Sequence, residues 1–190
     1  MDAFLLSFGV IFLAELGDKS QLMALAFATR FPAVPVLIAI SLATLIVHLG
    51  SVALGVTVAI ALPTNLIAIV AGVAFLVFAA WTLRGDQLGD DDEAKVRRAT
   101  TGSVIFTVGT AFFLAELGDK TMLATVTLAT NHEALGTWLG STAGMVAADA
   151  IAIGVGKVMG TRLPERAIRL GATVAFVVFG LILIWQGLRG

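Results

Sequence analysis

Cysteine is absent from this 190-residue chain, and charged residues make up only 13% of it. Without cysteine the chain forms neither disulfide bonds nor thiolate metal sites. The net charge is -1, which provides no basic surface for nucleic acid. The sequence also has no phosphate-binding glycine loop and no nucleophile-base pair, so it predicts neither an enzyme nor a bound cofactor.

Hydrophobic residues, in contrast, make up 58% of the chain. A soluble domain of this composition would expose large apolar patches, so lipid is the expected solvent. A spanning helix needs about 20 mostly apolar residues. Six stretches meet this requirement: residues 3–29, 34–62, 65–83, 103–130, 135–161 and 170–188. The sequence therefore predicts an all-α integral membrane protein with six transmembrane helices. The first helix is expected to be retained, because no basic segment marks it as a cleaved signal peptide.

One nine-residue segment occurs twice. It runs from Phe12 to Ser20 and returns 101 residues later, from Phe113 to Thr121, with eight of nine residues identical. Each half then holds three of the predicted helices. Because three is odd, the second half must cross the membrane in the opposite direction, which predicts the inverted repeat of many secondary transporters. We expect repeats at residues 1–85 and 102–190, joined by an acidic linker at residues 86–101.

Basic residues in the predicted loops are distributed unevenly. Nine fall on the side of the linker, and only Arg189 falls on the side of the N-terminus. Lys and Arg concentrate in cytoplasmic loops. We therefore expect a cytoplasmic linker, with both termini outside. The nine are Arg30, Arg84, Lys95, Arg97, Arg98, Lys157, Arg162, Arg166 and Arg169.

Both copies of the segment place charged residues inside apolar runs, where each charge costs about 2.5 to 3.5 kcal/mol to insert. In each copy a Glu and an Asp are three residues apart, so they would share one face of a continuous helix. A hydroxyl residue follows them. The fifth predicted span adds an aspartate, and the second adds a histidine at the aligned position. The candidate metal ligands are Glu15, Asp18, Ser20, Glu116, Asp119, Thr121, Asp149 and His48.

Lys19 and Lys120 allow a purely structural interpretation of these charges. Each follows a glutamate by four residues, a spacing at which a helix pairs the two side chains. Three aspartates would still lack a cation: Asp18, Asp119 and Asp149. Carboxylates in a low-dielectric interior must bind protons, bind a cation or alternate between the two. Alternation is what an antiporter does, with the lysines tuning the charge of the site.

Gly17 and Gly118 lie between the two acids of each copy. A glycine here allows either close helix packing or local unwinding of the helix. Unwinding would release backbone carbonyl groups as further ligands for an ion. The sequence leaves both interpretations open.

The segments from Glu15 to Ser20 and from Glu116 to Thr121 resemble the paired Glu-x-Gly-Asp-(Lys/Arg)-(Ser/Thr) signature of the Gdt-type cation transporters, which include the MneA-type manganese exporters. The resemblance covers the whole chain. It implies transport of Mn2+ or Ca2+ with protons as the counter-ion. It also implies that the motif acids bind the metal and that the two hydroxyl residues assist. The assignment of His48 and Asp149 rests on the repeat and on their depth.

Ligand chemistry narrows the choice of ion. Carboxylate and hydroxyl oxygens suit hard cations, and an imidazole from His48 favours Mn2+ over Ca2+. The sequence thus favours a secondary transporter that couples Mn2+ export to proton uptake, with a Ca2+/H+ antiporter on the same site as the alternative. A passive channel would need a polar stripe along its whole length, and a non-transporting scaffold leaves the surplus carboxylates unexplained. The expected partners are the metal, protons and the bilayer; the sequence also allows a homo-oligomer.

Overall fold

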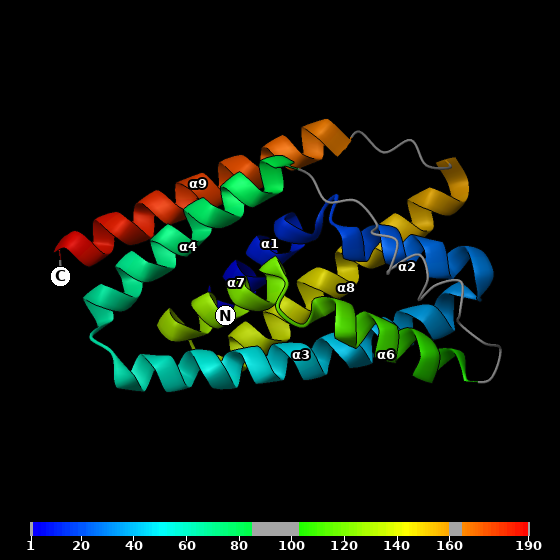
Figure 1. The fold of residues 1–190 in the computed structure, drawn as a ribbon, viewed down its shortest axis with the longest axis horizontal. Coiled ribbons are helices and arrows are strands. Elements are labelled where there is room, and N and C mark those ends of the chain that lie inside the picture. The colour runs from blue at the N-terminus through cyan, green and yellow to red at the C-terminus, as the bar shows by residue number, and fades with distance from the viewer. Residues whose placement is uncertain (1, 85–102, 160–164, 190) are drawn as a thin grey trace.

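The computed structural model describes residues 2–84, 103–159 and 165–189, and all regular structure in these ranges is helical (Figure 1). The predicted linker at residues 86–101 lies outside the described residues. The helices are α1 (Asp2–Glu15), α2 (Lys19–Arg30), α3 (Ala33–Ala61), α4 (Thr64–Arg84), α6 (Val104–Glu116), α7 (Lys120–Asn131), α8 (Ala134–Met159) and α9 (Glu165–Arg189).

In the residues that the structure describes, all six predicted apolar stretches form helices, but two of them are divided. The first stretch forms α1 and α2, and the fourth forms α6 and α7, whereas α3, α4, α8 and α9 each correspond to one predicted span. Within the described ranges, three helical segments are long and apolar enough to cross a membrane: Ala33–Ala61, Thr64–Arg84 and Leu170–Arg189. The described part of the chain is therefore all helical, with apolar helices of the kind that membrane proteins have.

Glycine causes both divisions. Gly17 and Gly118 have φ values of +76° and +83°, in the left-handed region that ends helices and that side chains with a Cβ disfavour. A Cβ on Gly118 would meet nothing within 4 Å, so close packing does not explain this glycine. Asp18 and Asp119 follow in extended conformation and occupy the N-cap positions of α2 and α7. Local unwinding, one of the two interpretations of these glycines, is confirmed.

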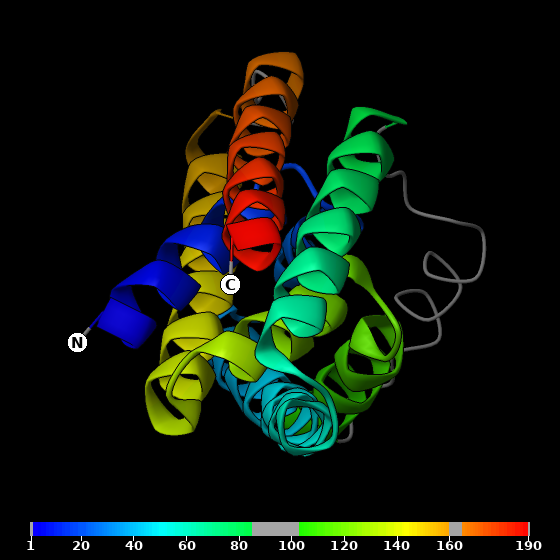
Figure 2. The ribbon, with the colours of Figure 1, turned by 90° about the vertical axis from the view of Figure 1, so that its left-hand side faces the viewer.

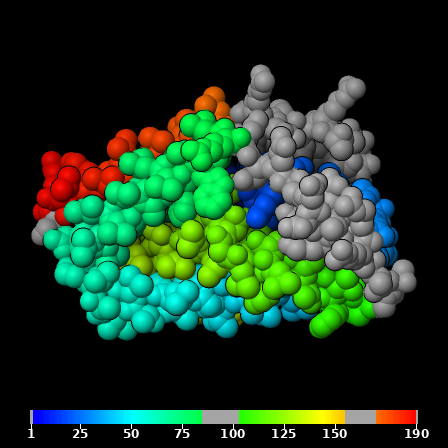
Figure 3. All heavy atoms as spheres, in the orientation of Figure 1, coloured from blue at the N-terminus to red at the C-terminus, as the bar shows by residue number. Residues whose placement is uncertain are grey.

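The outward faces of the helices are apolar. Val34, Ile60 and Leu188 have 67%, 82% and 73% of their surface exposed. Figure 3 shows one face of the molecule, on which α3 and α4 border a strip of α7; both α3 and α4 carry exposed large hydrophobic side chains. Apolar surface of this extent fits contact with lipid.

The two halves pack along α4 and α9, which lie side by side (Figures 1 and 2). Phe75 and Phe176, which are equivalent in the repeat, have ring centroids 5.8 Å apart. The ring centroids of Phe75 and Phe179 are 6.3 Å apart, and those of Phe176 and Phe78 are 6.2 Å apart. These two contacts are equivalent, because Phe78 and Phe179 also lie 101 positions apart. These aromatic contacts therefore join residues that occupy equivalent positions in the two copies of the repeated sequence.

The central helices α3 and α8 show the same relationship. Thr44 lies 3.5 Å from the sulfur of Met145, and these two residues are again 101 positions apart. One turn further along α3, His48 contacts Thr142, which precedes Met145 on α8. Because the contacts advance on one helix and recede on the other, α3 and α8 run antiparallel.

Candidate functional site

The first motif forms a hydrogen-bonded group at the break between α1 and α2. Glu15, Asp18 and Ser20 have no exposed surface. The hydroxyl of Ser20 lies within hydrogen-bond distance of Oε1 of Glu15 and, at 2.8 Å, of Oδ2 of Asp18. A hydroxyl carries one proton, so it can donate to only one of the two carboxyl groups at a time. The group thus brings two acids to one buried point.

The second motif repeats this arrangement with one difference. Thr121 donates to Oε2 of Glu116 at 2.9 Å, as Ser20 does to Glu15, and both residues are fully buried. Asp119, which is 6% exposed, makes no side-chain capping bond to α7. Its Oδ2 atom has no hydrogen-bond partner within the described ranges. The second aspartate is therefore less constrained than the first.

The two motifs meet through an ion pair between Lys120 and Asp18, whose side chains are 3% and 0% exposed. This contact corrects the pairing of each lysine with the glutamate of its own helix. That pairing requires a continuous helix, but Glu15 and Glu116 end their helices before the lysines begin the next ones. For the same reason the motif acids do not share a helix face. Asp18, predicted to lack a cation, has one from the other half of the chain.

Asp149, on α8, belongs to the same group of charges. It is fully buried, and neither of its carboxylate oxygens has a hydrogen-bond partner in the part of the chain that the structure describes. The residue before it, Ala148, accepts a hydrogen bond from Gln21 of α2, which places Asp149 beside the first motif, and the ion pair of Asp18 with Lys120 brings in the second. The structure thus gathers acids from both motifs and from α8 in one interior region.

His48 lies on α3 and is also fully buried. Its Nδ1 atom is 3.4 Å from the hydroxyl of Thr142, and its Nε2 atom has no hydrogen-bond partner among the described residues. No contact joins His48 to the motif acids. One ring nitrogen remains available to a ligand.

Within the described ranges, no three His, Asp or Glu side chains stand close enough together to hold a metal ion. The ammonium group of Lys120 instead sits against Asp18. Five buried carboxyl groups accompany this lysine: Glu15, Asp18, Glu116, Asp119 and Asp149. The five acids outnumber the one lysine that is paired with them, and carboxylate oxygens are the donors that hard cations prefer.

Gln21 is a residue of this region that the sequence analysis missed. Its side chain accepts a hydrogen bond from the backbone N–H of Gly17 at 2.9 Å and donates one to the carbonyl of Ala148, also at 2.9 Å. Gln21 therefore links the first broken turn to α8 beside Asp149. The equivalent residue, Met122, offers only a sulfur atom to Gly118, at 3.1 Å. A comparison of the two copies one residue beyond the motif would have found this difference.

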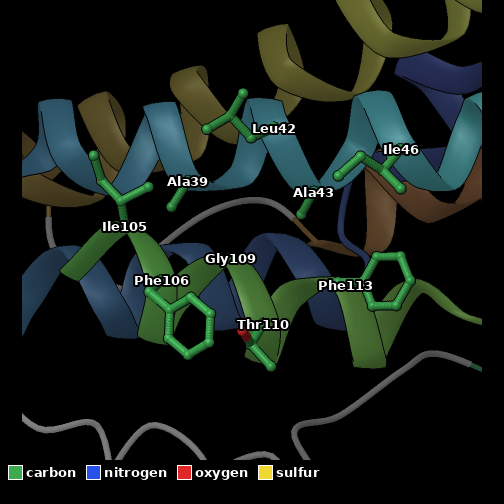
Figure 4. Close-up of a pocket in the computed structure, with 9 residues that line it drawn as sticks. All are labelled: Ala39, Leu42, Ala43, Ile46, Ile105, Phe106, Gly109, Thr110 and Phe113. Atoms are coloured by element: carbon green, nitrogen blue, oxygen red, sulfur yellow. The ribbon is translucent and has the colours of Figure 1, made fainter. Parts of the chain in front are cut away.

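Two open grooves run along α3 but do not form the ion site. One, of about 410 Å³, lies between α3 and α6, and Figure 4 shows the side chains that line it. The other, of about 500 Å³, continues along α3 to Leu117 and Met122. Both are lined almost wholly by apolar side chains. They fit lipid better than a cation.

Comparison with known proteins identifies the family. The family model described as divalent cation/proton antiporter GDT1 matches residues 3–90 and 104–190. A Vibrio cholerae protein named for manganese export is 35% identical over 184 residues, covering 95% of this chain and 90% of that one. The divalent cation/proton antiporter GDT1 of Saccharomyces cerevisiae is 24% identical, covering 98% and 84% of the two chains. No solved structure matches this chain. The chain belongs to the GDT1 family of divalent cation/proton antiporters.

Proposed function

We propose that the chain exports Mn2+ across a bacterial inner membrane in exchange for protons. The observation that carries this proposal is the meeting of both motifs inside the protein, with Lys120 of one paired to Asp18 of the other. Glu15, Asp18, Glu116 and Asp119 bind the ion, and Ser20 and Thr121 orient the two glutamates. Asp149 and His48 complete the set of ligands.

Exchange follows from the charge of this group. Buried carboxylates that lose a cation must take up protons, because an uncompensated charge in a low-dielectric interior is costly. Lys120 supplies a positive charge beside Asp18, so the site keeps a partial counter-ion when the metal has left. An arriving metal competes with Lys120 and with protons for the same oxygens. Metal and protons therefore occupy the site alternately.

The proposal includes a repeat of two three-helix units, residues 1–85 and 102–190, inverted with respect to each other and joined by a linker at residues 86–101. Three observations support it. Thr44 contacts its equivalent, Met145, and Phe75 contacts its equivalent, Phe176. The equivalent helices α3 and α8 run antiparallel, as inversion requires.

The proposed orientation places both termini outside, because the basic loop residues lie on the other side. The two ends of α4 test it, since Thr64 and Arg84 are both exposed. In a chain without native cysteine, Thr64→Cys should react with an impermeant thiol reagent added outside, and Arg84→Cys should not. The reverse pattern would invert the proposed topology.

Mn2+ is preferred over Ca2+ because of His48. Imidazole is a ligand for Mn2+, whereas Ca2+ takes oxygen alone. The Vibrio cholerae relative is named for manganese export, and the yeast relative is named for divalent cations in general. A Ca2+/H+ antiporter on the same carboxylates is the second candidate.

Flux into proteoliposomes of the purified protein tests the function. Mn2+ should move when a pH gradient is imposed, and protons should move in the opposite direction. The apparent affinity for Mn2+ should fall as the pH falls, because the ligands must be deprotonated to bind. Metal flux that needs no pH gradient and moves no protons would overturn antiport in favour of a passive channel.

A further inference from the structure

Three buried hydroxyl groups in the interior stand out because they are not satisfied by their own helices. Elsewhere in this chain, Ser41, Ser51 and Thr57 each donate to the carbonyl four residues earlier, the usual arrangement for hydroxyls in apolar helices. Thr82 on α4 and three further buried hydroxyls have no hydrogen-bond partner within the described ranges. These three also have no exposed surface. They are Ser7, Thr137 and Ser141.

These hydroxyls precede the acids of the site along two helices. Ser7 lies two turns before Glu15 on α1, and Ser141 lies two turns before Asp149 on α8. Eight residues of helix correspond to about 12 Å. Thr137 lies one turn further from Asp149. The hydroxyls therefore extend from the acids toward the end of the molecule at which α1 and α8 begin.

The two helices begin at the same end, because their contacts advance together. A Cβ on Gly140 would lie 2.9 Å from Cα of Phe4, and one on Gly144 would lie 2.5 Å from the carbonyl oxygen of Phe8. As α8 advances by one turn, so does α1. Ser7 is next to Phe8, which meets Gly144, and Ser141 is next to Gly140, which meets Phe4. The two hydroxyl residues therefore lie within about one helical turn of each other along the two helices.

The other half of the chain has apolar residues at the equivalent positions. At the offset of 101, Ser7, Thr137 and Ser141 correspond to Val108, Val36 and Ile40. These three side chains also have no exposed surface. Because α3 and α8 run antiparallel, the apolar set lies toward the opposite end of the bundle.

We propose that the hydroxyls of Ser7, Thr137 and Ser141 line the route by which the cation passes between the acids and the side where α1 and α8 begin. Val36, Ile40 and Val108 close the corresponding route on the other side until the protein changes conformation. This inference rests on the proposed transport function. In the orientation argued above, the hydroxyl-lined route is the one that leads outside.

The physical basis is that the hydroxyl-lined route and the apolar route differ in how well they stabilise water. A hard cation moves through a membrane protein only where oxygen atoms replace or support its hydration shell. Unpaired buried hydroxyls stabilise such water, whereas valine and isoleucine side chains exclude it and form a dewetted barrier. The two halves thus place equivalent helices on both sides of the site, but hydroxyl side chains line one route and apolar side chains line the other.

Single cysteines test the two routes without reference to transport, since the native chain has none. Six variants are compared: Ser7→Cys, Thr137→Cys, Ser141→Cys, Val36→Cys, Ile40→Cys and Val108→Cys. A small cationic methanethiosulfonate reagent is added to one side of sealed vesicles. The hydroxyl-set variants should react about tenfold faster or more, as expected if only their route is hydrated, and only from the side where α1 begins. Saturating Mn2+ should slow them.

Substitution by the residues of the other half provides the second measurement. Ser7→Val, Thr137→Val and Ser141→Ile should each reduce Mn2+ flux without reducing the amount of folded protein. Thr82→Val is the matched control, because Thr82 is 2% exposed and has an unpartnered hydroxyl but lies on α4. Its flux should equal that of the unsubstituted protein.

Each result bears on the inference. Equal reactivity of the two cysteine sets, reaction of the hydroxyl set from the linker side, or no reaction of the hydroxyl set would overturn it. Equal loss of flux in Thr82→Val would also count against it. If the unsubstituted protein moves no Mn2+ at all, the proposed function fails, while the cysteine pattern still reports which route is hydrated.

Discussion

Lys120 of the second motif forms a buried ion pair with Asp18 of the first. The equivalent lysine, Lys19, is only partly buried, and the structure shows no equivalent pair between Lys19 and Asp119 within the described residues. The site is therefore not symmetric, although the motifs are nearly identical. Substitutions at equivalent positions of the two motifs should therefore have different effects, although the sequence alone would predict the same effect for both.

The two motif aspartates should differ in their effect on stability. Asp18→Asn leaves Lys120 buried without its anionic partner, which typically costs about 3 to 5 kcal/mol. Asp119→Asn removes a charge that no such pair compensates, so folding should be unchanged. Both variants should lose Mn2+ flux because each removes a ligand. Thermal unfolding in detergent, measured beside flux, checks this; equal stability of the two variants would contradict the ion pair.

Removal of the lysine should rescue the unstable aspartate variant. Asp18→Asn combined with Lys120→Met no longer buries the ammonium group without its carboxylate, so its unfolding temperature should return toward that of the unsubstituted protein. Transport should not return, because the carboxylate is still missing. Asp18→Asn combined with Lys19→Met is the control and should show no recovery of stability. Recovery with Lys19→Met instead would reassign the partner of Asp18.

Gln21 should matter for transport rate and for the integrity of the first turn. Gln21→Met gives the first motif the residue of the second, and it leaves the N–H of Gly17 and the carbonyl of Ala148 without their partner. An unsatisfied buried group costs about 1 to 3 kcal/mol. We expect a lower maximal rate with a smaller change in the Mn2+ concentration for half-maximal flux. The reciprocal variant, Met122→Gln, should retain flux; a normal rate in Gln21→Met would remove Gln21 from the mechanism.

His48 should discriminate between ions. His48→Ala removes the imidazole and should weaken Mn2+ transport more than any Ca2+ transport, because nitrogen ligands favour Mn2+. Thr142→Val removes only the hydroxyl that contacts Nδ1 of His48, so it should change this selectivity less. Competition between the two ions in proteoliposomes measures the ratio. An unchanged ratio in His48→Ala would show that the histidine is a structural residue of α3.

The glycine at the second break should resist substitution for conformational reasons alone. Gly118→Ala meets no neighbouring atom but must hold alanine at a φ of +83°, which costs about 1 to 2 kcal/mol. Gly154→Ala is the matched control, since a Cβ there also meets nothing within 4 Å and Gly154 lies within helix α8. That variant should be as stable as the original protein or slightly more stable. Equal effects of the two substitutions would mean that backbone conformation is unimportant at the break.

The sequence by itself determined the class of protein, the positions of its apolar helical stretches and the residues of both motifs. These are properties of short segments: about 20 apolar residues specify a spanning helix, and identical segments 101 residues apart are visible without any structure. The sequence also indicated that the glycines of the motif could unwind a helix, because glycine alone tolerates positive φ.

Only the tertiary structure decided how the charges are paired. Glu15 and Lys19 have the spacing of a helical ion pair, but the break at Gly17 removes the helix on which that rule depends. The partner of Asp18 is instead Lys120, more than half the chain away. Such a contact depends on how α2 and α7 approach each other, which is set by the packing of all the helices and not by the residues beside either charge.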